Sequence, residues 1–152
     1  MKFHKIIASV FGIGYIGKGG GTIAAIFYGC IWLLLPESFC ISYLQLLIAL
    51  FITALGIWNS NNVDSIWGKD SSKVVIDEVA GMAITLLYLP QHIEFMIVGL
   101  VAFRFFDIVK PLGIKKLENL PRGWGVMADD VLAGIYALII VQLGLQLKLF
   151  LK

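Results

Sequence analysis

The stretch FCISYLQLLIALFITALGIW, residues 39–58, decides the class of fold. It contains 20 residues without a charged side chain, and a helix of about 20 apolar residues is long enough to cross the hydrocarbon core of a bilayer. A surface helix of a soluble protein carries one apolar stripe and a polar back, whereas this stretch is apolar on all sides. We therefore predict an integral membrane protein.

The composition of the whole chain agrees with this prediction. The 152 residues are 59% hydrophobic and only 14% charged, and the mean hydropathy is +0.90. This composition excludes a disordered chain. The net charge of +2 is too small for a protein whose main partner is a nucleic acid. The length fits a single domain, residues 1–152.

Four further apolar segments lie on either side of the opening stretch, at residues 22–35, 74–89, 93–106 and 131–147. Prolines, glycines and polar residues separate them. An open sheet would leave backbone groups without partners in lipid, so we predict an all-α, multi-pass membrane bundle of about five helices. Segments of 14 to 16 residues span roughly 21 to 24 Å, less than the full hydrocarbon core, so these helices are short.

Alternating crossings place the three long linkers, at residues 1–21, 59–73 and 107–125, on one side of the membrane. The positive-inside rule then assigns that side to the cytoplasm, because ten of the twelve basic residues lie on or near it: Lys2, Lys5, Lys18, Lys69, Lys73, Arg104, Lys110, Lys115, Lys116 and Arg122. Residues 1–16 resemble a secretory signal only weakly, and we interpret them as part of the mature chain, either an interfacial segment or the floor of a loop.

Two pairs of acids, Asp77-Glu78 and Asp129-Asp130, open the third and fifth apolar segments on this side. A glycine follows four residues after an acid in each pair, at Gly81 and at Gly134. Small residues let helices approach closely in membranes, which would bring the two pairs together.

The acid pairs have two interpretations. Acids at helix N-termini complement the helix dipole and cap free N–H groups. Alternatively, ionisable groups in membrane segments are costly and tend to be functional. Clustered carboxylates without His or Cys are hard oxygen ligands that suit Mg²⁺ or Mn²⁺.

Asp107 lies three residues from both Arg104 and Lys110, on one helix face if the helix continues to Pro111. The residues could form an intrahelical ion pair with a snorkelling lysine. Alternatively, Asp107 contributes to the metal site, and Arg104 or Lys110 holds an anionic group. Metal and fixed cations in one site are the combination that phosphoryl chemistry requires.

The run Gly17-Lys18-Gly19-Gly20-Gly21-Thr22 precedes the first long apolar segment. A glycine run is often a flexible linker, but it can also line an anion with backbone N–H groups. Thr22 could cap the following helix, whose N-terminus favours phosphate. On the second interpretation Lys18 and Thr22 lie on the phosphate side of the site.

Four blocks of the chain form a recognisable set, in this order: Gly12-Ile13-Gly14-Tyr15 with Gly21-Thr22, Ile76-Asp77-Glu78-Val79-Ala80-Gly81-Met82, Phe103-Arg104-Phe105-Phe106-Asp107-Ile108-Val109-Lys110-Pro111, and Gly123-Trp124-Gly125-Val126-Met127-Ala128-Asp129-Asp130-Val131-Leu132-Ala133-Gly134. In these blocks and their order, the sequence resembles the phosphatidylglycerophosphatase A family. The chain departs from the family at Gly20, where a proline usually precedes Gly-Thr.

The resemblance implies a Mg²⁺-dependent phosphatase that converts phosphatidylglycerophosphate to phosphatidylglycerol in the bacterial inner membrane, with its active site facing the cytoplasm. It implies Arg104, Lys110 and Thr22 as residues on the phosphate side. It also implies catalytic carboxylates at Asp77, Glu78, Asp107, Asp129 and Asp130. As metal ligands we expect the two acid pairs, Asp77, Glu78, Asp129 and Asp130.

Three other classes remain open. A small ion or proton transporter would also carry buried acids, but at midplane in several helices. An enzyme that transfers a group from a CDP-lipid to an alcohol would use paired acids and Mg²⁺, but its long spaced signature is missing. The third class is a non-catalytic membrane subunit whose acids only cap helices.

Overall fold

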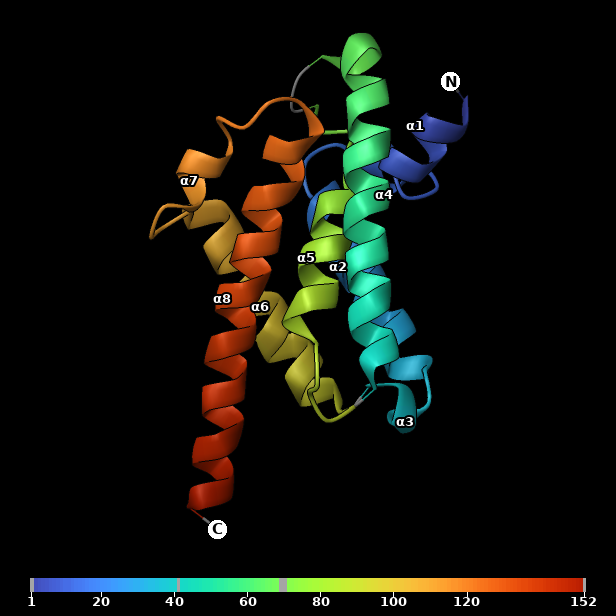
Figure 1. Ribbon diagram of the computed structural model, residues 1–152. Helices are drawn as coiled ribbons and strands as arrows, with labels where there is room; N and C mark the ends of the chain where they lie inside the picture. Colours follow the sequence, from blue (N-terminus) through green and yellow to red (C-terminus); the bar gives the residue numbers. More distant parts are fainter. Residues whose placement is uncertain (1, 41, 69–70, 152) are drawn as a thin grey trace.

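Helices account for all the regular structure that the computed structural model describes, which covers residues 2–40, 42–68 and 71–151. No strand occurs among these residues, and the all-α prediction is confirmed for them. Figure 1 shows the helices, which follow in the order α1 (Lys2–Ala8), the 3-10 helix η1 (Ile13–Ile16), α2 (Gly20–Leu34), α3 (Glu37–Cys40), α4 (Tyr43–Trp67), α5 (Ile76–Thr85), α6 (Ile93–Val109), α7 (Ile114–Leu117) and α8 (Gly123–Phe150).

The longer helices run alternately between two ends of the molecule (Figure 1). We call one of them the site end: α2, α5 and α8 begin there, and α4 and α6 end there. Helix α8 extends beyond its neighbours at the opposite end, so its last turns are largely exposed.

Helix α5 forms the centre of the bundle and packs against α2, α4, α6 and α8. It crosses α8 where two glycines meet. A Cβ atom added to Gly134 would lie 2.5 Å from the carbonyl oxygen of Gly81, so neither position leaves room for a larger residue. The hydroxyl of Thr85 donates to the same carbonyl at 2.9 Å. The close approach that the two glycines predict is therefore present.

Helix α4 continues nine residues beyond the predicted end at residue 58, into the stretch that we expected to be a polar linker. Its polar side chains are compatible with the helix because they bond to it: Asn59 Nδ2 donates to the carbonyl of Leu55 at 2.7 Å, and Asn62 Nδ2 donates to that of Trp58 at 2.7 Å. Asn59 is fully buried and shares a 2.8 Å hydrogen bond with His4, which attaches α1 to α4.

Helix α5 is shorter than the predicted segment 74–89, because its backbone leaves the helical path after Thr85. The buried side chain of Gln45 compensates for this break. Its amide donates to the carbonyl of Leu86 at 3.0 Å and accepts from the backbone N–H of Tyr88 at 3.2 Å. A buried broken helix needs such partners, since unpaired backbone groups are costly away from water.

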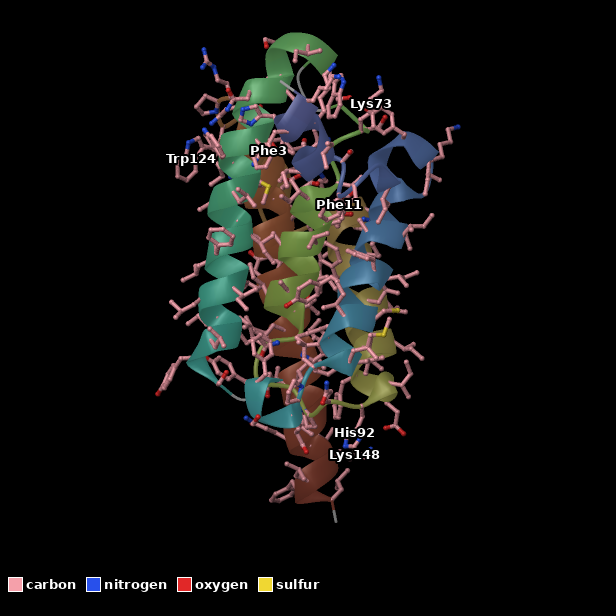
Figure 2. The ribbon with its side chains drawn as sticks, turned by 90° about the vertical axis from the view of Figure 1, so that its right-hand side faces the viewer. Phe3, Phe11, Lys73, His92, Trp124 and Lys148 are labelled. Carbon is pink, nitrogen blue, oxygen red and sulfur yellow. The ribbon has the colours of Figure 1, made fainter. Side chains whose placement is uncertain are left out.

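The outer surface of the bundle is strongly apolar. Within the described residues, α4 and α8 are the two helices that are long and apolar enough to cross a membrane, and only 28% and 39% of their most apolar windows are buried. A core helix of a soluble protein would be mostly buried. Figure 2 shows Lys73 near one end of the molecule, and His92 and Lys148 near the other.

Candidate active site

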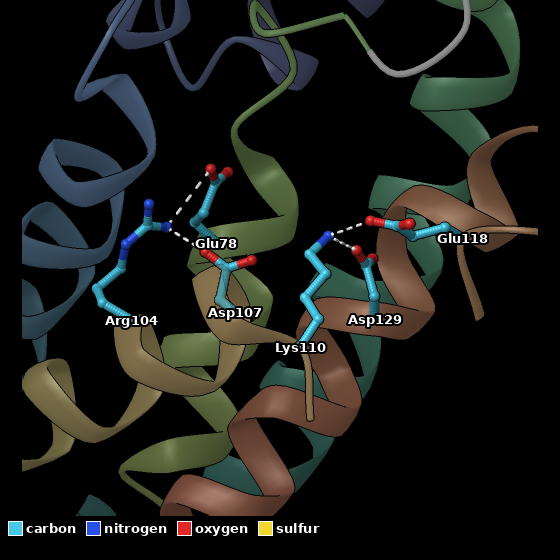
Figure 3. Close-up of polar contacts among 6 residues, drawn as sticks. All are labelled: Glu78, Arg104, Asp107, Lys110, Glu118 and Asp129. Atoms are coloured by element: carbon cyan, nitrogen blue, oxygen red, sulfur yellow. Dashed lines mark hydrogen bonds and ion pairs between the residues drawn. The ribbon is translucent and has the colours of Figure 1, made fainter. Parts of the chain in front are cut away.

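A polar cavity of about 490 Å³ opens at the site end of the bundle. Its lining combines five carboxylates with three basic side chains, a formal charge of −2 that one divalent cation would neutralise. Figure 3 shows the close-up of this region, where α5, α6 and α8 converge. The charged residues that line the cavity are Lys18, Asp77, Glu78, Arg104, Asp107, Lys110, Asp129 and Asp130.

Asp77 and Glu78 stand in the first turn of α5. The backbone N–H of Val75, just before them, donates to the carbonyl of Ala8 at 2.9 Å and holds the start of the helix against the N-terminal segment. Helix α2 approaches Glu78 so closely that a Cβ atom on Gly21 would overlap the carboxylate. Both acids of this pair therefore lie at the positive end of the α5 helix dipole, as the first interpretation of the acid pairs expects.

Asp129 and Asp130 do not open a helix, contrary to the sequence expectation. Helix α8 begins at Gly123, so both acids lie in its second turn. Gly123 packs against the backbone of α4 and donates its N–H to Asn61 Oδ1 at 2.9 Å, which fixes the early start. The two acids are only 6% and 3% exposed. Capping of a helix terminus therefore does not account for their presence.

Three of the carboxylates form a group that suits a metal ion. Asp77, Glu78 and Asp130 each offer an oxygen, and these oxygens lie within 4.8 Å of one another. Asp77 Oδ1, Glu78 Oε2 and Asp130 Oδ2 are buried and lack a hydrogen-bond partner among the described residues. Like charges packed this closely repel strongly unless a cation or a proton relieves them. Converging, unpaired carboxylate oxygens fit Mg²⁺, which prefers oxygen ligands.

Arg104 and Asp107 form the ion pair that their spacing predicts. Arg104 Nη1 lies 2.6 Å from Asp107 Oδ2 and 3.8 Å from Glu78 Oε1. The guanidinium thus bridges α6 and α5, as Figure 3 shows. Its Nε is buried and has no hydrogen-bond partner among the described residues, so it remains available to an oxygen ligand.

Lys110 does not share a helix face with Asp107, because α6 ends at Val109 and Lys110 adopts a left-handed conformation with φ 48°. Its ammonium instead donates to Asp129 Oδ2 at 2.5 Å and to Glu118 Oε1 at 2.7 Å. Burial lowers the pKa of Lys110, but the hydrogen bonds to the two carboxylates outweigh it and raise the pKa above its ordinary value. The hydrogen bond from Lys110 lowers the pKa of Glu118.

The glycine run contributes to the cavity wall, together with Lys18. Thr22 is not among the lining residues, and the expectation that it caps α2 is wrong. The helix begins two residues earlier, at Gly20, and Gly19 occupies the cap position with φ 98°. Gly19 can adopt this left-handed conformation without the strain that a side chain would bring.

Sequence reasoning missed three polar residues of this region. Ser71 and Ser72 line the cavity from the linker before α5, and Glu118 pairs with Lys110 across the turn around α7. No periodicity connects such positions, because each lies in an irregular segment. The linker at residues 59–73, which we expected on the same side as the acid pairs, also carries Asp64 and Asp70. Asp64 is not among the lining residues, and Asp70 lies outside the described residues.

The model of the phosphatidylglycerophosphatase A family matches residues 6–145. This range contains the five carboxylates and the three basic residues of the cavity.

Three curated relatives cover most of the chain. A Bacteroides thetaiotaomicron protein provisionally named phosphatidylinositol-3-phosphatase is 42% identical over 91% of this chain and 91% of its own length. The phosphatidylglycerophosphatase A of Haemophilus influenzae is 36% identical over 90% of this chain and 85% of its own. That of Escherichia coli is 31% identical over 76% of this chain and 66% of its own. No solved structure matches the chain.

Proposed function

The chain belongs to the phosphatidylglycerophosphatase A family and is a phosphatase, and from this premise we propose that it hydrolyses phosphatidylglycerophosphate to phosphatidylglycerol and inorganic phosphate. The observation that carries the proposal is the cavity at the site end. It combines a cluster of unpaired carboxylates with the basic groups of Arg104, Lys110 and Lys18. A phosphomonoester dianion needs both, since its charge must be neutralised and its leaving oxygen stabilised.

We assign the Mg²⁺ site to Asp77, Glu78 and Asp130, with Asp129 as a further ligand that Lys110 holds beside them. A bound Mg²⁺ supplies Lewis-acid stabilisation of the charge on the phosphoryl oxygens. Mg²⁺ dependence is therefore part of the proposal.

The basic side chains bind and orient the phosphate. Arg104 presents a planar guanidinium fork, which Asp107 holds in place, and this fork matches two phosphoryl oxygens. Lys110 is already charged and lies between two carboxylates, so it can shift its hydrogen bonds to a phosphate oxygen. Lys18 adds a cation at the cavity wall. One of the acids either attacks the phosphorus or takes the proton of an attacking water.

We further propose that the bundle crosses the bacterial inner membrane several times, with the site end in the cytoplasm. The apolar outer faces of α4 and α8 support the membrane placement. The concentration of basic residues in the linkers of the site end supports the orientation. A lipid headgroup would reach the cavity where the bundle leaves the hydrocarbon core.

Phosphatidylinositol 3-phosphate is the second candidate substrate, because the relative at 42% identity carries that activity in its name. Both lipids present a phosphomonoester on a polar headgroup, and the metal and cation set described above would serve either. They differ in the size of the group that carries the phosphate.

The test is phosphate release by the detergent-purified protein from each lipid, with and without MgCl₂. We expect Mg²⁺-dependent turnover of phosphatidylglycerophosphate that exceeds turnover of the inositol lipid. The Asp129→Asn variant should be inactive, and Glu94→Gln should retain activity because this exposed acid lies at the opposite end of the bundle.

Two results would overturn parts of the proposal. If the protein prefers the inositol lipid, phosphatidylinositol 3-phosphate becomes the proposed substrate. If turnover is the same in excess EDTA, the reaction does not depend on Mg²⁺. If the folded protein releases no phosphate from either lipid with any divalent metal, ion flux in liposomes becomes the assay for the rival transporter function.

A further inference from the structure

A second cluster of basic side chains lies at the site end, outside the catalytic cavity. We call it the lysine–aromatic platform and define it as Lys5, Tyr15, Trp67 and Lys73. The ammonium of Lys73 lies 5.9 Å from the ring centre of Tyr15 and 5.8 Å from that of Trp67, while the ammonium of Lys5 lies 5.9 Å from the Trp67 ring. The two rings meet edge to face, 5.9 Å apart. Four separate segments thus supply one surface.

The two lysines of the platform have no carboxylate partner among the described residues. The ion pairs among the described residues involve Arg104, Lys110 and Lys148 instead. An ammonium group carries three donors, and a ring face at nearly 6 Å satisfies none of them as a hydrogen bond. The positive charge of the platform is therefore available to an external anion.

An apolar groove of about 280 Å³ adjoins the platform and shares Lys5 and Tyr15 with it. Phe11, in its lining, is 78% exposed, an unusual position for a large apolar side chain unless lipid or another apolar partner covers it. Figure 2 shows Phe11 closer to the middle of the bundle than Lys73. The apolar part of the surface therefore lies toward the hydrocarbon core and the cationic part toward the headgroups.

We propose that the platform and this groove bind an anionic phospholipid of the surrounding membrane, at a site separate from the catalytic cavity. The cations would hold the headgroup phosphate, and the groove would hold the first part of an acyl chain. The charge of the lysines selects an anionic over a zwitterionic headgroup. The inference rests on the membrane placement proposed above and not on the phosphatase reaction.

The platform is joined to the start of α5, which carries Asp77 and Glu78. A Cβ atom on Gly14 would overlap the carbonyl of Lys73, so the N-terminal segment packs directly on this part of the backbone. The neighbouring Val74 lines the catalytic cavity. A lipid bound across Lys5 and Lys73 would link these two segments and stabilise the position of α5.

The experiment is native mass spectrometry of the detergent-purified chain, titrated with dioleoyl phosphatidylglycerol or with dioleoyl phosphatidylcholine. The test variant combines Lys5→Gln with Lys73→Gln. The matched control combines Lys115→Gln with Lys116→Gln, which removes the same charge from exposed positions on α7. We expect the wild type to retain one phosphatidylglycerol selectively, the test variant to bind it roughly ten- to thirtyfold more weakly, and the control to match the wild type.

The proposal would be overturned if the wild type and the test variant bound phosphatidylglycerol equally well. It would also be overturned if the control variant lost as much phosphatidylglycerol binding as the test variant. Lipid held in the catalytic cavity would not respond to the platform substitutions. The charge-conserving pair Lys5→Arg with Lys73→Arg should restore binding. If the double variant fails to fold, Lys73→Gln alone provides the comparison, because this side chain is exposed. None of these measurements depends on turnover, so failure here leaves the proposed reaction untouched.

Discussion

At the scale of single residues, the site brings together side chains that would be unfavourable anywhere else in the molecule. Asp129 and Asp130 are almost fully buried in the second turn of a long apolar helix. Such burial costs folding free energy unless a cation or a hydrogen bond compensates each charge. Lys110 compensates Asp129. No described residue compensates Asp130 Oδ2, which is why this acid is the most informative position to change.

We expect Asp130→Asn to lower kcat/KM by about a hundredfold or more, since it removes one of the three converging carboxylates. Without Mg²⁺ the same variant should be at least as stable as the wild type, because it relieves repulsion within the cluster. Phosphate release and thermal unfolding in detergent measure the two effects. Activity within threefold of the wild type would exclude Asp130 from the site.

Arg104→Lys tests whether the guanidinium fork binds the phosphate. A lysine keeps the charge but presents a single donor centre, so it cannot contact Asp107 and two phosphoryl oxygens together. We expect kcat/KM to fall by roughly ten- to a hundredfold. Arg122→Lys, at an exposed position of the same end, should leave the kinetics unchanged. If kcat/KM of the Arg104→Lys variant equals that of the wild type, a positive charge at this position is enough for phosphate binding and the guanidinium fork is not needed.

At the scale of elements, the distance between the acid pairs depends on one helix crossing. Asp77 and Glu78 lie in α5, and Asp130 lies in α8. The two backbones meet at Gly81 and Gly134, one turn further along each helix. Any side chain at this crossing pushes α5 and α8 apart and separates the acids.

Gly134→Ala should therefore destabilise the bundle by about 1 to 3 kcal/mol and lower activity as well. The new methyl group would meet the Gly81 backbone, which cannot move aside as a flexible side chain would. The control is Gly144→Ala on the same helix, where a Cβ atom meets nothing within 4 Å. That change should be neutral or slightly stabilising, because alanine favours helix. Equal melting temperatures for both variants would contradict the packing argument.

At the scale of the whole molecule, the bundle places a charged cavity at one end of an apolar body. Its apolar outer surface suits lipid, while the cavity and the basic linkers suit the headgroup region. Because the cavity carries a formal charge of −2, we expect a divalent cation that binds there to stabilise the whole fold.

Addition of MgCl₂ should raise the melting temperature of the wild type in detergent. Saturation at a hundred times the dissociation constant is worth about 2.7 kcal/mol, which corresponds to several degrees for a chain of this length. EDTA should reverse the rise, and Asp130→Asn should show little of it, while Glu94→Gln should behave as the wild type. A melting temperature insensitive to millimolar Mg²⁺ would argue against a metal ligand set in this cavity.

The proposed orientation predicts which positions a membrane-impermeant maleimide reaches in intact cells. In a background with both native cysteines changed to serine, Lys115→Cys should be protected until the cells are opened. Glu94→Cys, at the opposite end, should react from outside. The native side chains at both positions, Lys115 and Glu94, are exposed. The reverse pattern would invert the topology.

The all-α class and the eight charged residues that line the cavity can be predicted from the sequence, whereas Ser71 and Ser72 in its wall cannot. Uncharged runs such as residues 39–58 are decisive because lipid allows few ways to satisfy a backbone. The motifs around Asp77, Asp107 and Asp130 stand out because charge is rare and costly in an apolar chain. The paired spacings to Gly81 and Gly134 also predicted where α5 and α8 would meet.

The helix ends and the partners of the charged groups depend on long-range packing and become visible in the folded bundle. Helix α8 begins at Gly123 because α4 and Asn61 hold that residue, a contact across 62 positions that no local pattern reveals. Lys110 binds Asp129 and Glu118 instead of sharing a face with Asp107, because α6 ends at Val109 and the chain turns. Local periodicity determines which residues can share a helix face, whereas long-range packing determines where the helix stops and which charges meet.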